Sequence, residues 1–301
     1  MPCVEVADVS DLLPPTMFEH LRAEVGRHRM QFFDGTVKHA LVHRYDDPPV
    51  AATHEESERI GKRNDELLNE VFACSRIVRP TRRHGSVTGY LSADGSVDGR
   101  NFTYPDSALD VPEALRLFAF RNRDLQELRA LVGPFLRAMH GEYWPFRMAV
   151  QYYYMGYEVN DWKGRYLCWG SSALHALYSP SSEKLLRRIR VFLGEGTPIY
   201  APEDHLEFEF EKPNPTTIGD VIEDINEVRN CIAHGERIPD KYFEAGAGRN
   251  DSGRQVNYIS VLDDALAFIV RETLRRILAD DLLDGFTSRR GVSVFWKSKG
   301  L

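Results

Sequence analysis

The sequence predicts a mainly α protein, with a helical bundle over residues 116–301 and an α/β or irregular region over residues 1–115. Two observations lead to this prediction. From about residue 122 onwards, apolar residues recur at spacings of three and four, the pattern of helices with one buried face. Residues 80–112 are instead rich in Gly, Ser and Asp, which indicates loops and one hairpin. Successive amphipathic helices joined by mostly short loops favour a bundle in the second part.

Only a few elements can be assigned in the N-terminal region. Residues 15–33 are compatible with a short helix, and residues 37–45 (VKHALVHRY) alternate as a strand does. Thr53 followed by Glu56 is a capping-box pattern, so a helix is expected from there to about Arg76. Its expected apolar side consists of Ile60, Leu67, Leu68, Val71 and Phe72.

Six helices are expected in the second part, and the first three lie between about residues 122 and 178. The first is expected to bend at Pro134, because proline lacks an amide hydrogen and clashes with the preceding turn. The second starts near Trp144, with Pro145 at the first helical position, which proline favours. The third covers about residues 161–178. Their apolar faces are, in order, Leu125, Leu128, Leu131, Val132, Phe135, Leu136 and Met139; Phe146, Ala149, Val150, Tyr153, Tyr154 and Tyr157; and Leu167, Gly170, Ala173, Leu174 and Leu177.

The other three helices follow residue 180. Ser181 or Ser182 opens the fourth and Thr216 or Thr217 opens the fifth, because Ser and Thr are favoured N-caps. A short strand is expected between them, over residues 205–212. The apolar faces are Leu185, Leu186, Ile189 and Phe192 for the fourth; Ile218, Val221, Ile222, Ile225, Val228 and Ile232 for the fifth; and, over residues 257–280, Ile259, Leu262, Leu266, Ile269, Val270, Leu274 and Ile277 for the sixth.

Composition limits the class of protein. The chain has 301 residues, of which 43% are hydrophobic and 28% charged, an ordinary profile for a globular protein. No run approaches the roughly 18 apolar residues of a membrane span, and the acidic start is unlike a signal peptide, so no membrane partner is expected. With a net charge of −7, the chain as a whole does not attract polyanions, and a nucleic-acid partner would require a local basic patch.

Metal-ligating residues do not cluster in the sequence. The cysteines Cys3, Cys74, Cys168 and Cys231 lack paired spacing, which argues against a zinc site or a disulfide framework and favours a reducing, cytoplasmic location. His39 and His43 have the spacing of helical metal ligands, but their segment is predicted to be a strand. A phosphate-binding P-loop and a G-x-S-x-G nucleophile motif are also missing from the sequence. The sequence therefore predicts no metal site and no cofactor.

The candidate site lies at the end of the fifth predicted helix, in DVIEDINEVRNCIAHGERIPD (220–240). Asn230 and His234 are four residues apart and share a helix face. Arg229 is about 140° from His234 on an ideal helix, but its side chain is long enough to reach the space beside the imidazole, particularly if the last turn unwinds. A guanidinium binds phosphate oxygens and a histidine moves protons near neutral pH, which suits a phosphodiester substrate. The helix dipole alone also favours Arg and His at a C-terminus, so a purely structural end, capped by Gly235, is the alternative.

RNCIAHG resembles the R-N-x-x-x-H motif of HEPN domains, and the preceding helices are similar to those of the ApeA-like branch. The relevant stretches are WPFRMAVQYYYMGYE and RYLCWGSSALHALYS, and the resemblance covers about residues 120–285. This chain departs from the family at two positions. It has His175 where relatives often carry Glu, and Glu236 where HEPN toxins paired with nucleotidyltransferase antitoxins often have Tyr.

The resemblance implies a metal-independent endoribonuclease that forms a homodimer, with one composite site built from two motifs. Arg229 would stabilise charge in the transition state, and His234 would be the general acid or base for attack by the 2′-OH, giving a 2′,3′-cyclic phosphate. Asn230 would orient the histidine or contact phosphate. Such nucleases act in phage defence, abortive infection and toxin systems, so RNA and an antitoxin or regulatory protein are implied partners. The alternatives are a catalytically inactive HEPN domain that binds RNA or nucleotide, and an all-helical interaction module.

Two basic segments are candidates for RNA binding. Their cations are Arg79, Arg82 and Arg83 in RPTRRHG, and Arg289, Arg290 and Lys297 in SRRGVSVFWKSKGL. For the first segment the alternative is a solvated turn. In the second, Phe295 and Trp296 lie among the basic residues, which suits stacking with single-stranded bases. The alternative is a tail that docks both aromatic rings on its own core.

Overall fold

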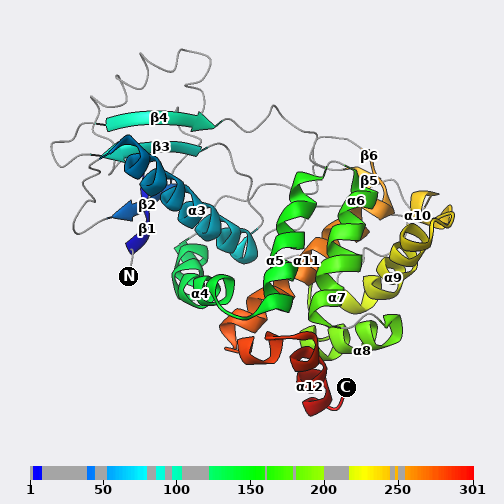
Figure 1. Cartoon of the computed structure of the whole chain (residues 1–301). Coiled ribbons are helices and arrows are strands. Elements are labelled where there is room, and N and C mark those ends of the chain that lie inside the picture. Colours follow the sequence, from blue (N-terminus) through cyan, green and yellow to red (C-terminus); the bar gives the residue numbers. More distant parts are fainter. Residues whose placement is uncertain are drawn as a thin grey trace. The chain divides into compact units, whose positions relative to one another are not determined.

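The computed structural model describes residues 3–8, 39–44, 53–79, 86–91, 97–103, 122–159, 161–178, 181–199, 217–244, 248–249 and 255–301. These residues belong to two compact units, the first comprising residues 1–72 and 81–108 and the second comprising residues 73–80 and 109–301. The described part is mainly helical, as predicted (Figure 1). The predicted boundary between residues 115 and 116 lies outside the described residues. None of the described helices combines the length and apolar character that a membrane crossing requires.

The first unit contains two antiparallel strand pairs. β1 (Cys3–Asp8) pairs with β2 (His39–Arg44), and β3 (Ser86–Leu91) pairs with β4 (Val97–Thr103). The strand predicted over residues 37–45 and the hairpin predicted within residues 80–112 are therefore confirmed. Because His39 and His43 lie on a strand, the helical spacing of a metal pair does not apply to them. The expected helix at residues 15–33 lies outside the described residues.

A long helix, α3 (His54–Val78), belongs partly to each unit. It begins as predicted, because the Thr53 hydroxyl accepts a hydrogen bond of 3.2 Å from the Glu56 amide. Its last turn lies in the second unit, where the Tyr153 hydroxyl donates a hydrogen bond of 3.1 Å to the Arg76 carbonyl oxygen. This bond satisfies a carbonyl group that the helix end leaves without an intrahelical partner.

The second unit is built mainly from helices, and the starts predicted for the bundle are confirmed within a few residues. Pro134 lies inside the first of these helices and Pro145 near the start of the second. The strand expected over residues 205–212 lies outside the described residues. The elements are α4 (Asn122–His140), α5 (Trp144–Glu158), α6 (Trp162–Tyr166), α7 (Leu174–Leu177), α8 (Ser182–Leu193), α9 (Ile218–His234), α10 (Lys241–Glu244), the strand pair β5 (Gly248–Arg249) and β6 (Gln255–Val256), α11 (Tyr258–Ala279), a 3₁₀-helix (Leu283–Phe286) and α12 (Arg289–Ser298).

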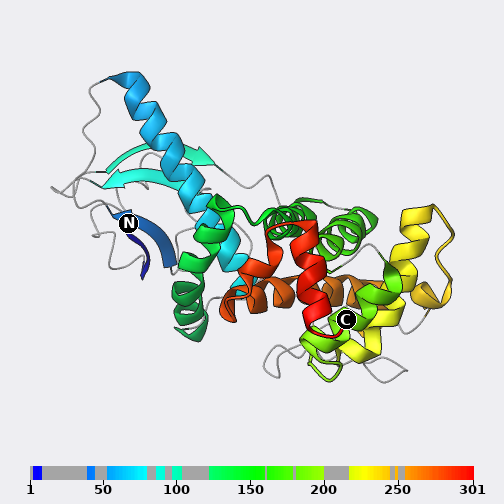
Figure 2. The ribbon, with the colours of Figure 1, turned by 60° about the horizontal axis from the view of Figure 1, so that its bottom comes forward.

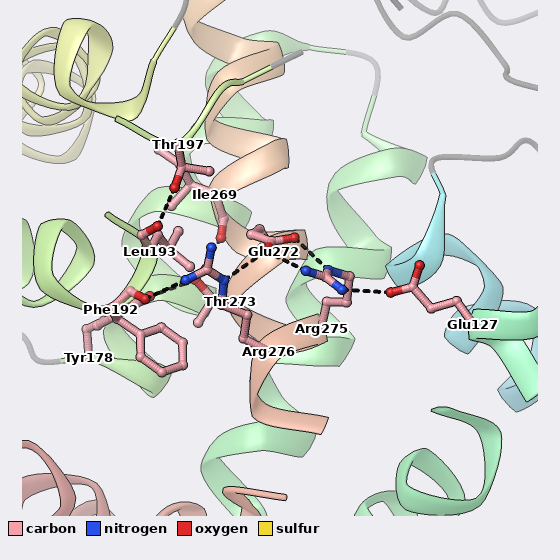
Figure 3. A network of polar contacts seen from close by, with 10 residues as sticks. All are labelled: Glu127, Tyr178, Phe192, Leu193, Thr197, Ile269, Glu272, Thr273, Arg275 and Arg276. Atoms are coloured by element: carbon pink, nitrogen blue, oxygen red, sulfur yellow. Dashed lines mark hydrogen bonds and ion pairs between the residues drawn. The ribbon is translucent and has the colours of Figure 1, made fainter. Parts of the chain in front are cut away.

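Helix α11 is the central helix of this unit. It packs against α4, α5, α6, α8, α9 and α10, and the whole apolar face predicted for it is buried. Charged side chains on α11 also reach its neighbours (Figure 3). The Glu272 carboxylate accepts hydrogen bonds from Arg275 and Arg276 at 2.7–2.8 Å. Arg275 extends to Glu127 of α4, and Arg276 donates to the Phe192 carbonyl of α8, each at 2.8 Å.

The third predicted helix contains a π-helix in its middle. Residues Leu167–Ala173 form this segment (η2) between α6 and α7, and the Leu174 amide donates to the Trp169 carbonyl, five residues earlier. The extra residue per turn rotates the buried face of the helix. Gly170, Ala173, Leu174 and Leu177 are buried as predicted, whereas Leu167 is 44% exposed. The prediction for Leu167 was wrong because it assumed a uniform spacing of about 3.6 residues per turn.

Helix α12 was not among the predicted helices. Trp296 is buried, its indole N–H donates a hydrogen bond of 2.9 Å to the Leu177 carbonyl, and its ring stacks on Tyr178 with centroids 5.0 Å apart. Phe295 packs against Phe286 at 5.1 Å. The structure therefore shows the alternative in which both aromatic rings dock on the core of the protein. The C-terminal residues lie beside α8, as Figure 2 also shows.

Candidate functional site

Arg229, Asn230 and His234 all lie in the last turns of α9, whose two ends are well defined. At the start, a capping box links Thr217 with Asp220, as the residue types favour. At the end, Gly235 adopts the predicted left-handed conformation with φ of 69°. The Glu236 amide donates a hydrogen bond of 2.8 Å to the Cys231 carbonyl oxygen. This Schellman-type arrangement fixes where the helix stops and the chain turns away.

The Arg229 side chain points into the protein and is only 6% exposed. Its position explains this burial, because Arg229 follows Ile225 by four residues and Ile222 by seven, and so lies on the apolar stripe of α9. One terminal nitrogen of the guanidinium, Nη1, lies 3.0 Å from Nε2 of His175. The other, Nη2, donates a hydrogen bond of 2.7 Å to Oδ1 of Asn230. Burial lowers the pKa of Arg229, but an arginine side chain keeps its charge in proteins.

His175 is the partner that spacing alone did not reveal. It lies in α7, directly after the π-helix, and 54 residues separate it from Arg229. A guanidinium only donates hydrogen bonds, so Nε2 of His175 must be the acceptor, and the ring must then be neutral with its proton on Nδ1. Burial, and secondly the positive charge of Arg229, lower the pKa of His175 below its ordinary value of 6.5. Both effects favour the neutral ring that the hydrogen bond requires.

Gly170 in the π-helix provides the space for the arginine. A Cβ atom at this position would lie 3.1 Å from Cγ and 3.3 Å from Cδ of Arg229. It would also lie 3.6 Å from Leu266 of α11. The aliphatic part of Arg229 therefore passes over a glycine backbone on its way to His175. The π-helix thus supplies both the space for the arginine and the helix that carries its imidazole partner.

Asn230 and His234 differ from Arg229 in their surroundings. Asn230 is half-buried with its side-chain oxygen held by Arg229, while His234 is exposed at the helix end and shares a face with Asn230. The guanidinium of Arg229 is directed to His175 and Asn230. The arrangement is a chain of the half-buried His175, the buried Arg229 and the half-buried Asn230, with an accessible imidazole one turn further on.

The predicted RNA-binding residues divide into three groups. Arg79 is buried and its Nε lies 3.6 Å from the Asp124 carboxylate, so its charge is directed inward. Arg82 and Arg83 lie outside the described residues. The cations of the second segment are all exposed on α12, namely Arg289, Arg290 and Lys297. That helix therefore presents positive charge to solvent while its aromatic residues face the core.

A second polar cluster holds the chain segment that follows the motif. The Tyr242 hydroxyl donates to Asp224 at 3.0 Å and to Glu227 at 2.7 Å, and the Lys241 ammonium donates to Glu227 at 2.8 Å. The Tyr258 hydroxyl donates to the other oxygen of Asp224 at 2.8 Å. Hydrogen bonds from Lys241 and then Tyr242 lower the pKa of Glu227. This cluster joins α9, α10 and α11 on the side of α9 that carries its acidic residues.

The described residues bring together no group of three or more His, Cys, Asp or Glu side chains that could hold a metal ion. Comparisons with protein-family models, curated proteins and solved structures found no match to this chain. The chemistry at the end of α9 is therefore the basis on which a function is inferred.

Proposed function

We propose that this chain is a metal-independent endoribonuclease of the HEPN type, acting in phage defence, abortive infection or a toxin system. The main support for this proposal is that His234 is exposed at a fixed helix end. It shares a helix face with Asn230, which the buried Arg229 holds by a hydrogen bond of 2.7 Å. The R-N-x-x-x-H motif and the mainly helical fold add support. Cytoplasmic RNA is the proposed substrate, and a second copy of the chain completes the site.

The proposed reaction is an internal displacement at phosphorus. The ribose 2′-oxygen forms a bond to phosphorus, the bond between phosphorus and the 5′-oxygen breaks, and a 2′,3′-cyclic phosphate results. A base removes the proton of the 2′-OH and an acid protonates the departing 5′-oxygen. An imidazole performs either role near neutral pH, so the two His234 side chains of a homodimer would supply one group each.

We propose for Arg229 a role other than direct contact with phosphate. Its hydrogen bonds go to His175 and Asn230, and its side chain is almost fully buried. We therefore assign it to holding Asn230, whose amide would orient His234 or meet the RNA. The positive charge of a buried group is also screened less than that of a surface group, so it favours a phosphate nearby.

One observation favours a second candidate function, the binding of RNA or nucleotide without cleavage. An arginine that is 6% exposed, with hydrogen bonds to His175 and Asn230, offers little surface to a transition state. Exposed His234 and the cations of α12 would then serve recognition alone. The two candidates differ in one measurable outcome, which is the appearance of new RNA ends.

The test compares wild-type protein with His234→Ala in a cleavage assay on mixed RNA containing EDTA. His140→Ala is the matched control, because His140 is also an exposed histidine that ends a helix. We expect His234→Ala to lose about 10²–10⁴-fold in rate, the usual contribution of a general acid or base. The control should cleave normally, with cyclic phosphate ends. Equal cleavage by His234→Ala and the wild type would exclude this mechanism, and RNA binding without cleavage would support the second candidate.

A further inference from the structure

The hydrogen bond between Arg229 and His175 requires one protonation state. The two nitrogens are 3.0 Å apart and the arginine is the obligatory donor. A protonated imidazole carries a proton on both ring nitrogens and offers no lone pair. Protonation of His175 would therefore remove the acceptor of Nη1 and place two cations in contact.

Among the described residues, burial and the charge of Arg229 are the influences that act on His175, and both oppose a positive charge on the ring. From α9, Arg229 is the charged group whose field acts on the ring. The helices α5 and η2 pack against α7, and their titratable groups with a shifted pKa are Tyr153, Tyr157 and Cys168. Burial raises the pKa of each of these, so they are neutral near pH 7. A proton on His175 would thus be opposed by burial and by the charge of Arg229.

The same guanidinium also holds Asn230. Nη2 donates to the Asn230 oxygen while Nη1 meets His175, and the planar guanidinium keeps the two directions fixed relative to each other. A rotation that moves Nη1 away from a charged imidazole must also move Nη2 away from Asn230. Asn230 shares its helix face with His234, so the change reaches the accessible end of α9.

We propose that His175 is a positioning residue of the site, and that the site is assembled only while this imidazole is neutral. Acid would then disassemble the His175–Arg229–Asn230 chain. The effect on RNA rests on the proposed function, whereas the proton-dependent hydrogen bond does not. A carboxylate or amide at residue 175 would accept the same hydrogen bond without titrating between about pH 5 and 8.

The first experiment reads the hydrogen bond without any activity. Nitrogen-15 NMR of the histidine rings should show His175 near pH 7 with a bare Nε2, a proton on Nδ1 and a pKa below 6.5. In Arg229→Gln the pKa of His175 should move up, because the repelling charge is gone. The ring of His140 is the internal reference and should not respond. A His175 with a protonated Nε2 at neutral pH, or with a pKa indifferent to Arg229→Gln, would overturn the proposal.

The second experiment measures the pH profile of RNA cleavage for the wild type, His175→Gln, His175→Glu and His175→Leu. Each group that must be neutral for activity adds about one to the slope of log kcat/KM against pH on the acid side of the profile. The wild type should therefore approach a slope of about two, while the Gln and Glu forms should fall with a slope of about one. His175→Leu lacks an acceptor and should be impaired at every pH.

The outcomes separate this proposal from the nuclease itself. An unchanged acid limb in His175→Gln would overturn the positioning role. If the wild type cleaves nothing at any pH while the NMR result is as expected, the nuclease function falls. In that case RNA binding, measured by fluorescence, is the quantity followed against pH in place of cleavage. If acid weakens RNA binding equally in the wild type and in His175→Gln, the positioning role of His175 is overturned.

Discussion

Gly170 is the residue on which the path of Arg229 depends. Alanine is a better helix former than glycine, by about 0.5–1 kcal/mol, but a methyl group at this position would lie 3.1 Å from Cγ of the arginine. We expect Gly170→Ala to displace the guanidinium from His175 and to raise the pKa of His175, with little net change in stability. NMR titration of the ring and thermal unfolding check both parts.

Gly133→Ala is the matched control for that change. Gly133 lies inside α4, and a Cβ there would have nothing within 4 Å. It should stabilise the protein by about 0.5–1 kcal/mol and leave His175 unaffected. An unchanged His175 in Gly170→Ala as well would show that the arginine tolerates the methyl group.

Asp264 of α11 is buried, and among the described residues neither of its oxygens has a hydrogen-bond partner. Its neighbour Asp263 instead forms an ion pair of 2.6 Å with Arg165. Burial, and then the charge of Asp263, raise the pKa of Asp264 well above its usual range. The folded state therefore keeps this proton at pH values where the unfolded chain has lost it, so stability falls as pH rises above about 4.

We expect Asp264→Asn to change stability little near pH 4 and to raise the free energy of unfolding at pH 7 by about 1 kcal/mol or more. The reason is that an amide has no charge to bury. Denaturant unfolding at both pH values measures the effect. Exposed Asp280, at the end of the same helix, is the control position for an Asp→Asn change. A loss of stability at pH 7 would mean that the carboxylate has a stabilising partner.

At this scale the sequence predicted the three motif residues but not the way in which they are connected. The spacing of Asn230 and His234 placed them on one face, and exposed His234 is consistent with that. The burial of Arg229 follows from its spacing, because Arg229 lies on the same stripe of α9 as Ile222 and Ile225. His175 could not be found from spacing, because residues 54 positions apart meet only in the folded chain, where the π-helix that precedes α7 packs against α9.

At the scale of elements, α5 and the π-helix approach each other closely. The Trp169 indole donates 3.0 Å to the Tyr153 carbonyl, and a Cβ at Gly156 would lie 2.0 Å from the indole nitrogen. Such an approach is possible only where one helix presents a glycine. Trp169 is thereby fixed within the π-helix that leads to His175.

We expect Gly156→Ala to lower the free energy of unfolding by about 1–3 kcal/mol, the usual cost of overpacking a core. The Trp169 ring must shift, so its fluorescence should change together with the melting temperature. Gly133→Ala again serves as the control, since it adds the same methyl group to a helix with open space. A fully stable Gly156→Ala protein would show that α5 and the π-helix separate easily.

The capping and proline signals predicted where helices begin because they act within one turn. The Thr53 and Thr217 caps and Pro145 all mark observed helix starts. The π-helix was not predictable in this way, because LCWGSSA has no local signal for a wider turn. Its register follows from the packing of Trp169 against α5. Helix α12 was missed because its basic and aromatic residues also suited an RNA-binding tail.

At the scale of the molecule, positive charge is presented locally on a chain of net charge −7. Helix α12 exposes Arg289, Arg290 and Lys297 and ends beside α8, whose Lys184 and Arg187 are also exposed. If RNA binds the protein, the cations of this region would contact its phosphates and release the counterions bound to the RNA. Composition revealed the need for such a patch, but only the docking of Trp296 determines which side of α12 faces solvent.

We expect Lys297→Glu to weaken RNA binding and to lower the slope of log K against log salt by about 0.7 for each lost phosphate contact. Titrations at several salt concentrations measure both quantities. The control is Arg129→Glu, which reverses an exposed charge on α4 instead. Equal losses in the two variants would indicate that only the overall charge matters.

The fold class could be predicted because helix periodicity is a property of the sequence itself, and the described chain is mainly helical. The two-part organisation was predicted more coarsely. Residues 73–80, at the end of α3, belong to the second unit, although they precede the Gly- and Ser-rich stretch. A helix that continues from one unit into another has no compositional boundary for a sequence-based division to use.

The π-helix has a consequence for how the chain tolerates insertions and deletions. Removing one residue between Leu167 and Ala173 would let this stretch wind as an ordinary α-helix. Every residue after the deletion would then turn by about 100° around the axis, and the imidazole of α7 would leave α9. The number of residues here, as well as their identity, is therefore constrained, in contrast to a surface loop, which absorbs changes of length at little cost.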